Sequence, residues 1–276
     1  MDRRRGRGAG GTGAGPLNPI PVIAVSGLPA VRWGGRAALL FRRSVYFSDG
    51  NDAMVAVVGR SAGASPAGFR LATETPANDW GLGTSSWLKF DGSRWTLDGR
   101  HLAIDGREGI EEAARWESLP RIAPLGSLAD RLAELVPDLD QEWNFLFWQA
   151  HAFARLRPVD PMTGIHAATL IGRGSGSTPI GDDFLAGWLG GLARQGHAEL
   201  PVHRTLAARL VDTCRLSRHF LHHALAGRFH SGLVRLARLS SLPAKNHPLA
   251  LALAAQGDRS GRAALAGYAT GIYQGA

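Results

Sequence analysis

The residues whose types and spacing suit chemistry gather between positions 172 and 191, which read GRGSGSTPIGDDFLAGWLGG. Spaced glycines lead into two adjacent carboxylates, Asp182 and Asp183, at the expected start of an apolar helix. A helix N-terminus preceded by glycines presents free backbone N–H groups and attracts anions. Paired carboxylates beside open glycine backbone also suit Mg²⁺, which binds few protein oxygens. Two interpretations stay open here: a ligand site, or aspartates that only stabilise the helix dipole.

We therefore predict Asp182 and Asp183 as catalytic groups or Mg²⁺ ligands; Mg²⁺ is the one cofactor that the residues suggest, and the sequence does not identify another. Polar residues on a predicted helix over 204–226 could face the glycine loop, although a hydroxyl bonded to its own helix backbone is the alternative. A small anionic substrate is the expected ligand. The candidate ligand-binding residues are Arg173, Gly174, Gly176, Thr178, Gly181, Thr213, Ser217, Ser260, Gly261 and Arg262.

A weaker copy of the motif starts 80 residues further on. When 181–191 is aligned with 261–271, five of the eleven positions are identical, and Trp188 is matched by Tyr268. Glycines spaced four apart on a helix let another backbone approach closely. We therefore expect two glycine-faced helices to pack together with their N-termini at one end. Chance similarity between two helices rich in alanine and glycine is the alternative.

The periodicity of the chain predicts an α+β fold in two parts. Asp49-Gly50, Asp91-Gly92 and Asp98-Gly99 separate short apolar runs and are typical of hairpin turns. Closely spaced strands of this kind predict an antiparallel sheet or a small barrel. After Ser127, which we expect to cap a helix, the period becomes helical. The expected organisation is an unordered arginine- and glycine-rich tail at 1–16, a β-rich domain at 17–125 and an all-helical domain at 126–276.

Composition excludes several classes of protein. The single cysteine, Cys214, excludes an intrachain disulfide and a multi-cysteine zinc site, and we expect it to be a small buried residue. No apolar run approaches the roughly 20 residues that a bilayer span needs. The basic N-terminus lacks the features of a signal peptide, so we expect a cytoplasmic protein with no membrane partner. The net charge of +8 is not arranged as a basic stripe interleaved with aromatics, which argues against nucleic acid.

Two histidines one helical turn apart, His219 and His223, form a weak candidate metal pair. No HExxH motif and no obvious third ligand accompany them. We expect them on a solvated or partner-facing helix surface.

These motifs resemble the AllH-like family, a domain of unknown function whose pattern runs close to G-x-G-x-G-L-T-P-S-G-D-D-F-L-x-G. Residues 172–187 follow this pattern, with Ser177 where leucine is usual and Ile180 where serine is usual. The segments Thr213 to Gly227 and 257–267 fit two further parts of it. The resemblance implies a subunit of oxamate carbamoyltransferase, which moves a carbamoyl group between oxamate nitrogen and phosphate together with partner subunits.

The leading hypothesis is a carbamoyltransferase-type subunit, or a relative with a different small anionic substrate. Carbamoyl transfer passes through an oxyanion and needs preorganised donors, with arginine near the phosphate. Arg173 and Arg262 are the candidates for that arginine. The alternatives are a non-catalytic assembly or ligand-binding subunit, and a Mg²⁺-dependent hydrolase of small amides or nucleosides. The sequence leaves open whether the isolated chain is an enzyme.

Overall fold

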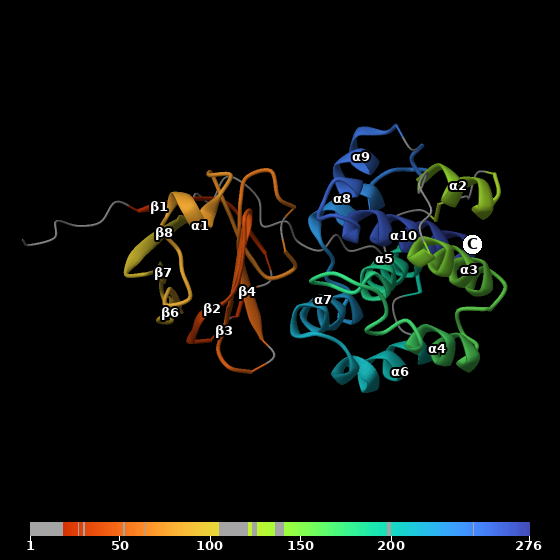
Figure 1. Ribbon diagram of the computed structural model, residues 1–276, viewed down its shortest axis with the longest axis horizontal. Coiled ribbons are helices and arrows are strands. Elements are labelled where there is room, and N and C mark those ends of the chain that lie inside the picture. Colours follow the sequence, from red (N-terminus) through yellow and green to blue (C-terminus); the bar gives the residue numbers. More distant parts are fainter. Residues whose placement is uncertain are drawn as a thin grey trace, which may run out of the picture.

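The computed structural model places strands in the first half of the chain and helices in the second, which confirms the α+β prediction (Figure 1). The predicted tail at 1–16 lies outside the described residues, and so does the segment EGIEEAARWES at 108–118, whose sequence predicts a short helix. The structure describes residues 19–26, 28–29, 31–51, 53–63, 65–104, 121–122, 126–135, 141–197, 200–244 and 246–276.

Eight strands close into a barrel in the order β1-β5-β4-β3-β2-β6-β7-β8, and β8 returns to pair with β1 in parallel. Closure leaves no strand edge open to another chain. A short helix, α1 (Pro76–Asp79), separates β5 from β6. The strands are β1 (Ile20–Ser26), β2 (Trp33–Phe41), β3 (Ser44–Ser48), β4 (Met54–Val58), β5 (Gly68–Leu71), β6 (Trp87–Phe90), β7 (Trp95–Leu97) and β8 (Arg100–Ile104).

Turn residues explain why these strands pair as they do. Asp98 and Gly99 both adopt positive φ, at 48° and 78°, as the tight turn between β7 and β8 requires. Gly92 and Gly50 take φ of 106° and 97° between β6 and β7 and between β3 and β4. The predicted Asp-Gly hairpins are therefore confirmed. Alternate residues point inward and fill the barrel with a buried apolar core.

The second half is helical, and none of the described helices is long and apolar enough to cross a membrane. The helices surround two central members, α5 and α10 (Figure 1). Their bounds are α2 (Leu128–Leu135), α3 (Gln141–Ala154), α4 (Pro161–Ala168), α5 (Ile180–Arg194), α6 (Pro201–Arg209), α7 (Arg215–Leu225), α8 (Ser231–Ala237), α9 (Pro248–Ala254) and α10 (Ser260–Gly275).

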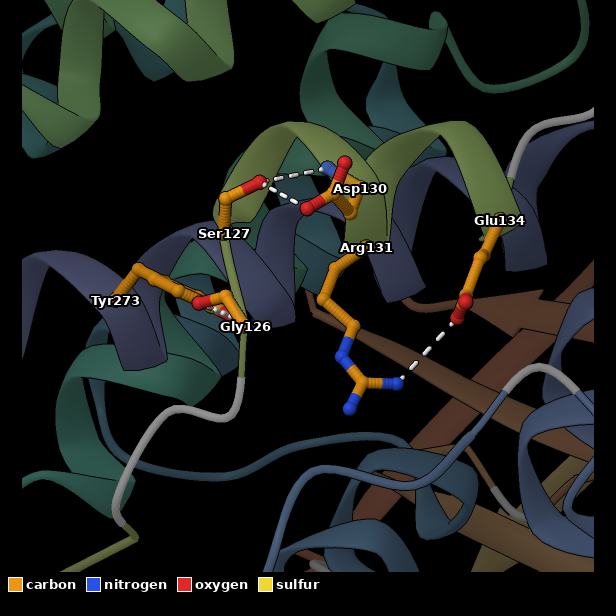
Figure 2. Close-up of polar contacts among 6 residues, drawn as sticks. All are labelled: Gly126, Ser127, Asp130, Arg131, Glu134 and Tyr273. Carbon is orange, nitrogen blue, oxygen red and sulfur yellow. Dashed lines mark hydrogen bonds and ion pairs between the residues drawn. The ribbon is translucent and has the colours of Figure 1, made fainter.

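Ser127 caps α2, as the sequence predicts (Figure 2). Its hydroxyl accepts the amide N–H of Asp130 at 3.1 Å and donates to the Asp130 carboxylate at 2.6 Å. Such a cap satisfies an N–H group that the helix itself leaves unpaired. Tyr273 of α10 donates its hydroxyl to the Gly126 carbonyl at 2.9 Å, which fixes the start of α2 against α10.

Glycines bring α5 and α10 into backbone contact. A Cβ added to Gly187 would lie 1.9 Å from the carbonyl oxygen of Ala264. A Cβ added to Gly267 would likewise lie 1.9 Å from the carbonyl oxygen of Phe184. The two glycines are 80 residues apart in the sequence, and so are the two residues whose carbonyl groups they contact. The repeated motif therefore corresponds to a two-fold relation between α5 and α10.

The same relation repeats one turn later. A Cβ on Gly191 would lie 2.3 Å from the Tyr268 carbonyl oxygen, and one on Gly271 would lie 2.4 Å from that of Trp188. Because both partners advance by four residues, the two helices run parallel. Their N-termini therefore share one end, which confirms the predicted packing of two glycine-faced helices.

Helix α7 joins the helical half to the barrel (Figure 1). Arg215 donates to the Ser48 hydroxyl at 2.5 Å and also to the carbonyl of Asn51. Nearby, the Phe220 ring meets the edge of Tyr46, with ring centroids 6.1 Å apart. The barrel is thus in contact with the helix that follows the predicted site.

The predicted continuous helix over 204–226 is wrong. Helix α6 ends at Arg209, a short 3₁₀ turn follows over Leu210–Asp212, and Thr213 is extended at φ −120° and ψ 171°. The chain then restarts as α7 at Arg215. The break turns the Thr213 side chain toward α5.

Candidate functional site

The first turns of α5 and α10 meet through hydroxyl groups. The Thr178 hydroxyl, just before α5, lies 3.0 Å from that of Ser260, the first residue of α10. Thr178 also donates to a carboxylate oxygen of Asp183 at 2.9 Å. We call these three residues the hydroxyl–carboxylate cluster. It stands at the positive ends of two parallel helix dipoles, where negative charge is stabilised.

Asp182 and Asp183 are neighbours in sequence but have different surroundings. Asp182 is 2% exposed, and both of its oxygens accept hydrogen bonds. One accepts the N–H of Gly172 at 2.9 Å and the other accepts the Thr213 hydroxyl at 2.5 Å. Asp182 therefore ties the glycine loop to the break before α7. Burial and these two bonds limit the access of a metal ion to this carboxylate.

The pKa of Asp182 follows from this burial. Loss of solvent raises the pKa, while the bonds from Thr213 and Gly172 lower it. The nearby Ser217 hydroxyl lowers the pKa further, although it makes no well-formed hydrogen bond to any residue that the structure describes. Of the predicted ligand-binding residues, Thr213 and Ser217 are thus brought to Asp182.

Asp183 keeps part of its surface exposed and lies in the cluster with Thr178 and Ser260. Burial of its carboxyl group raises the pKa to about 7, and the charge of Asp182 adds to that rise. The hydroxyls of Ser260 and Thr178 act in the opposite direction. A carboxyl group that titrates near neutral pH can both accept and donate a proton there.

The barrel contributes Tyr46, for which the sequence holds no motif. Burial raises the pKa of the Tyr46 phenol to about 12, its hydrogen bond with Ser44 lowers it, and the charge of Asp183 raises it again. Tyr46 is therefore within electrostatic reach of Asp183. The start of α7 also connects the cluster to the barrel, because Cys214 donates to the Ser177 carbonyl, next to Thr178, and Arg215 donates to Ser48 of β3.

The glycines that begin the two helices serve close packing. A Cβ on Gly181 would lie 2.2 Å from the Leu170 carbonyl oxygen, and one on Gly261 would lie 1.8 Å from that of Leu253. Their N–H groups donate at 2.9 Å to the carbonyls of Arg173 and Gln256, respectively. The N–H groups of Gly181 and Gly261 are therefore already hydrogen-bonded within the protein, whereas the sequence suggested N–H groups that are free to bind an anion.

The glycine loop itself is exposed. Gly174 and Gly176 have φ of 97° and 111°, a region that residues with a side chain rarely adopt. A Cβ on Gly174 would also lie 2.8 Å from the Ile180 side chain. These glycines therefore allow the loop to fold back over the start of α5.

The two candidate arginines flank this region without an acidic partner. Arg173 is exposed, and its Nε donates to the Thr169 carbonyl at 3.4 Å. Arg262 is half-buried in the first turn of α10. Neither guanidinium forms an ion pair with a residue in the described ranges. Both cations therefore remain available to an anionic ligand.

The expectations for His219, His223 and Cys214 are wrong. The two histidines are 3% and 8% exposed, with ring centroids 4.5 Å apart, because their face of α7 packs inside the protein. Burial lowers their pKa values to about 4 and about 3. Cys214 is exposed, and its thiol donates to the Ser177 carbonyl at 3.3 Å. Across the described part of the chain, no three His, Cys, Asp or Glu side chains are grouped to hold a metal ion.

The fold and site define an α+β protein in which a barrel adjoins a pair of parallel, glycine-packed helices. Residues 170–272 match the model of the family described as oxamate carbamoyltransferase subunit AllH. This part of the chain is AllH-like, which confirms the predicted resemblance, and the matched segment contains both helix starts. No curated protein and no solved structure matches the chain.

Proposed function

We propose that the protein is a carbamoyltransferase-type subunit whose reacting groups assemble at the hydroxyl–carboxylate cluster of Thr178, Asp183 and Ser260. The observation that carries this proposal is the meeting of a carboxylate and two hydroxyls at the positive ends of two parallel helices. The AllH family match to this same segment supports a carbamoyl substrate.

The chemistry requires a proton acceptor next to a site that stabilises negative charge. When the amide nitrogen of oxamate attacks the carbamoyl carbon of carbamoyl phosphate, a tetrahedral oxyanion forms, the nitrogen loses a proton, and the C–O bond to phosphate breaks as phosphate leaves. Asp183 is placed to accept that proton, and to return it to the leaving nitrogen in the reverse direction. The hydroxyls of Thr178 and Ser260 hold its carboxylate in position. The two helix dipoles, each equivalent to about half a positive charge, favour the oxyanion.

Phosphate recognition falls to the arginines. Arg262 lies in the first turn of α10, and Arg173 lies in the loop before α5. A guanidinium binds phosphate oxygens through paired N–H donors, which suits the phosphate of carbamoyl phosphate. Asp182 acts as a positioning residue, because its bonds to Gly172 and Thr213 hold the loop that carries Arg173.

Partner subunits belong to the same proposal, because the matched family is named as a subunit. The cytoplasmic location expected from the sequence is proposed with it. A binding subunit without catalysis is the second candidate, and it is favoured by the occupied N–H groups of Gly181 and Gly261. A Mg²⁺-dependent hydrolase is less favoured, because both oxygens of Asp182 already accept protein hydrogen bonds.

Thermal unfolding of the full chain with carbamoyl phosphate, oxamate or Mg²⁺ tests the proposal. We expect carbamoyl phosphate to raise the Tm by linkage, and Arg262→Gln to weaken that shift. Stabilisation by Mg²⁺ alone would favour the hydrolase, and no shift with any of the three would favour a purely assembling subunit.

Transfer activity, measured with the partner subunits present, separates catalysis from binding. Asp183→Asn keeps a side chain that can bond Thr178 but removes the proton acceptor. We expect the transfer rate to fall by about 10²–10⁴ while carbamoyl phosphate still stabilises the protein. An Asp183→Asn variant that transfers at the wild-type rate would exclude Asp183 as the general base.

A further inference from the structure

A groove of about 710 Å³ lies where the start of β2 pairs with β6 on the barrel. Its volume is within the range of small-molecule sites. It is lined by residues of the barrel and none of the hydroxyl–carboxylate cluster, so it is separate from the proposed reaction site. The lining residues that matter here are Arg32, Gly34, Trp87, Lys89, Phe90 and Asp91.

One indole ring provides a platform in this groove. Trp87 is 45% exposed, which is unusual for so large an apolar side chain. The guanidinium of Arg36, its cross-strand partner, lies 4.9 Å from the Trp87 ring centroid. Trp33 is only 8% exposed, and Phe90 stacks on Trp95 within the barrel core. Trp87 is thus the ring in this groove that has substantial exposed surface.

Gly34 leaves space beside that platform. A Cβ on Gly34 would come no closer than 3.9 Å to any atom outside its chain neighbours, so packing does not require glycine there. Its neighbour Gly35 is different, because a Cβ there would lie 2.6 Å from the Ser48 backbone. A larger side chain at position 34 would occupy the groove without displacing the strands.

Two cations line the groove without a partner. Arg32 and Lys89 are exposed, and within the described ranges neither forms an ion pair. The carboxylate of Asp91 is engaged by its own turn: one oxygen accepts the N–H groups of Ser93 and Arg94, at 2.8 and 2.9 Å, and the Ser93 hydroxyl. These bonds do not remove the negative charge of Asp91, so two cations and one carboxylate leave the groove lining with a net charge of +1.

We propose that this groove binds a mononucleotide, with its base against Trp87 and its phosphate at Arg32 and Lys89. A flat π-system stacks on an exposed indole, and phosphate suits a pair of unpartnered cations. A single-stranded nucleic acid is less suited, because strand binding uses several platforms in succession and this groove offers one.

Calorimetric titration of the full chain with 5′-AMP tests this site. We expect saturable binding at one site, weaker binding of adenosine and of ribose 5-phosphate, and loss of affinity as salt is raised. Gly34→Leu fills the groove and leaves its cations and indole in place, so it should weaken AMP binding by about tenfold or more. Trp87→Ala should cost about tenfold through lost stacking, and Lys89→Gln about threefold to tenfold.

Matched controls keep the result interpretable. Arg42→Gln removes a barrel charge outside the groove and should bind AMP as the wild type does, whereas Gly34→Ala adds only a methyl group to the groove and should weaken binding less than Gly34→Leu. Unchanged Tm values would show that the variants fold. Absence of saturable AMP binding, or wild-type affinity in Gly34→Leu, would overturn the proposal. If a short single-stranded oligonucleotide binds about a hundredfold more tightly than AMP, the ligand of this groove is a nucleic-acid strand and the mononucleotide proposal is overturned.

Discussion

At the start of α5 the first turn carries Asp182 and Asp183, whereas the corresponding positions of α10 carry Arg262 and Ala263. The backbones around these positions follow the same plan. In both helices the opening glycine presses against an earlier carbonyl group and donates its N–H to the loop before it. Two similar helix starts therefore supply different side chains to one place.

The comparison of α5 with α10 distinguishes the residues that pack the two helices together from the residues that carry functional groups. The glycines that recur 80 residues apart are those at which the backbones of α5 and α10 are in contact. A side chain would not fit at these positions. The residues that do not repeat supply carboxylate from one helix and hydroxyl and guanidinium from the other. A symmetric scaffold thus holds an asymmetric set of functional groups.

The largest effect is expected where the two helices touch. Gly187→Ala would place a methyl group 1.9 Å from the Ala264 carbonyl oxygen, a backbone atom that cannot move without shifting α10. We expect it to lower the free energy of unfolding by about 3 kcal/mol or more. Urea denaturation followed by circular dichroism measures this value.

Gly190→Ala, on the same helix, is the control. A Cβ there would lie 3.6 Å from Phe229, which is ordinary contact, so we expect a change of about 1 kcal/mol or less. Gly267→Ala should match Gly187→Ala, because the two positions are related by the two-fold. Equal stability of the Gly187→Ala and Gly190→Ala variants would contradict the packing described here.

The adjacent aspartates should respond in opposite directions, although burial raises the pKa of both. Asp182→Asn replaces one of two hydrogen-bonded acceptor oxygens by a donor, and we expect this loss to outweigh the relief of a buried charge and to cost about 1–3 kcal/mol of stability. Asp183→Asn removes a charge that the folded protein disfavours. Above pH 7 we expect it to add about 1–3 kcal/mol, discounted because Asp183 is partly exposed.

The raised pKa of Asp183 also determines how the stability of the protein changes with pH. The pKa of Asp183 is raised by burial from 3.8 to about 7, so the folded protein holds the proton more strongly than the unfolded chain. The wild type therefore loses stability as pH rises from about 4 to about 7. The advantage of Asp183→Asn should grow across this window and be absent near pH 4. An advantage that is equal at pH 4 and pH 8 would argue against the raised pKa.

A smaller change tests what α10 contributes to the shared site. The Ser260 hydroxyl lowers the pKa of Asp183, so Ser260→Ala should raise it further. We expect the acidic limb of the pH–rate profile to move upward by about 0.5–1 pH unit, with a stability change of about 1 kcal/mol or less. Ser240→Ala removes an exposed hydroxyl outside the cluster and serves as a comparison. An unmoved profile in Ser260→Ala would separate α10 from the chemistry.

Local signals predicted much of this fold. The Asp98-Gly99 turn, the Ser127 cap and the glycine faces of α5 and α10 each depend on residues close together in sequence, or on a period that a helix imposes. Helix geometry also sets Asp182 and Asp183 about 100° apart, which is why neighbouring carboxylates reach different surroundings. Which of the two is buried depends on the elements packed around α5, and no local pattern records that.

Distant contacts account for the errors. Residues 204–226 contain no glycine or proline and favour one long helix, yet Thr213 leaves the helix and bonds Asp182. A tertiary bond here overrides local helix propensity. The approach of Tyr46 to Asp183 likewise depends on α7 packing on the barrel, and the burial of His219 and His223 depends on contacts from outside their own helix. The closed strand order depends on the pairing of β1 with β8, which lie at opposite ends of the barrel sequence.

The parallel course of α5 and α10 has a consequence for how the protein folds. Parallel neighbours cannot be joined by a short loop, so four helices intervene between them, and their glycine contacts join residues that are 77 to 83 positions apart. Contacts between distant segments form slowly because loop closure costs entropy before the contacts compensate for it. During synthesis the glycine face of α5 stays uncovered until α10 is made. We expect folding of the helical half to be limited by the arrival of its last helix.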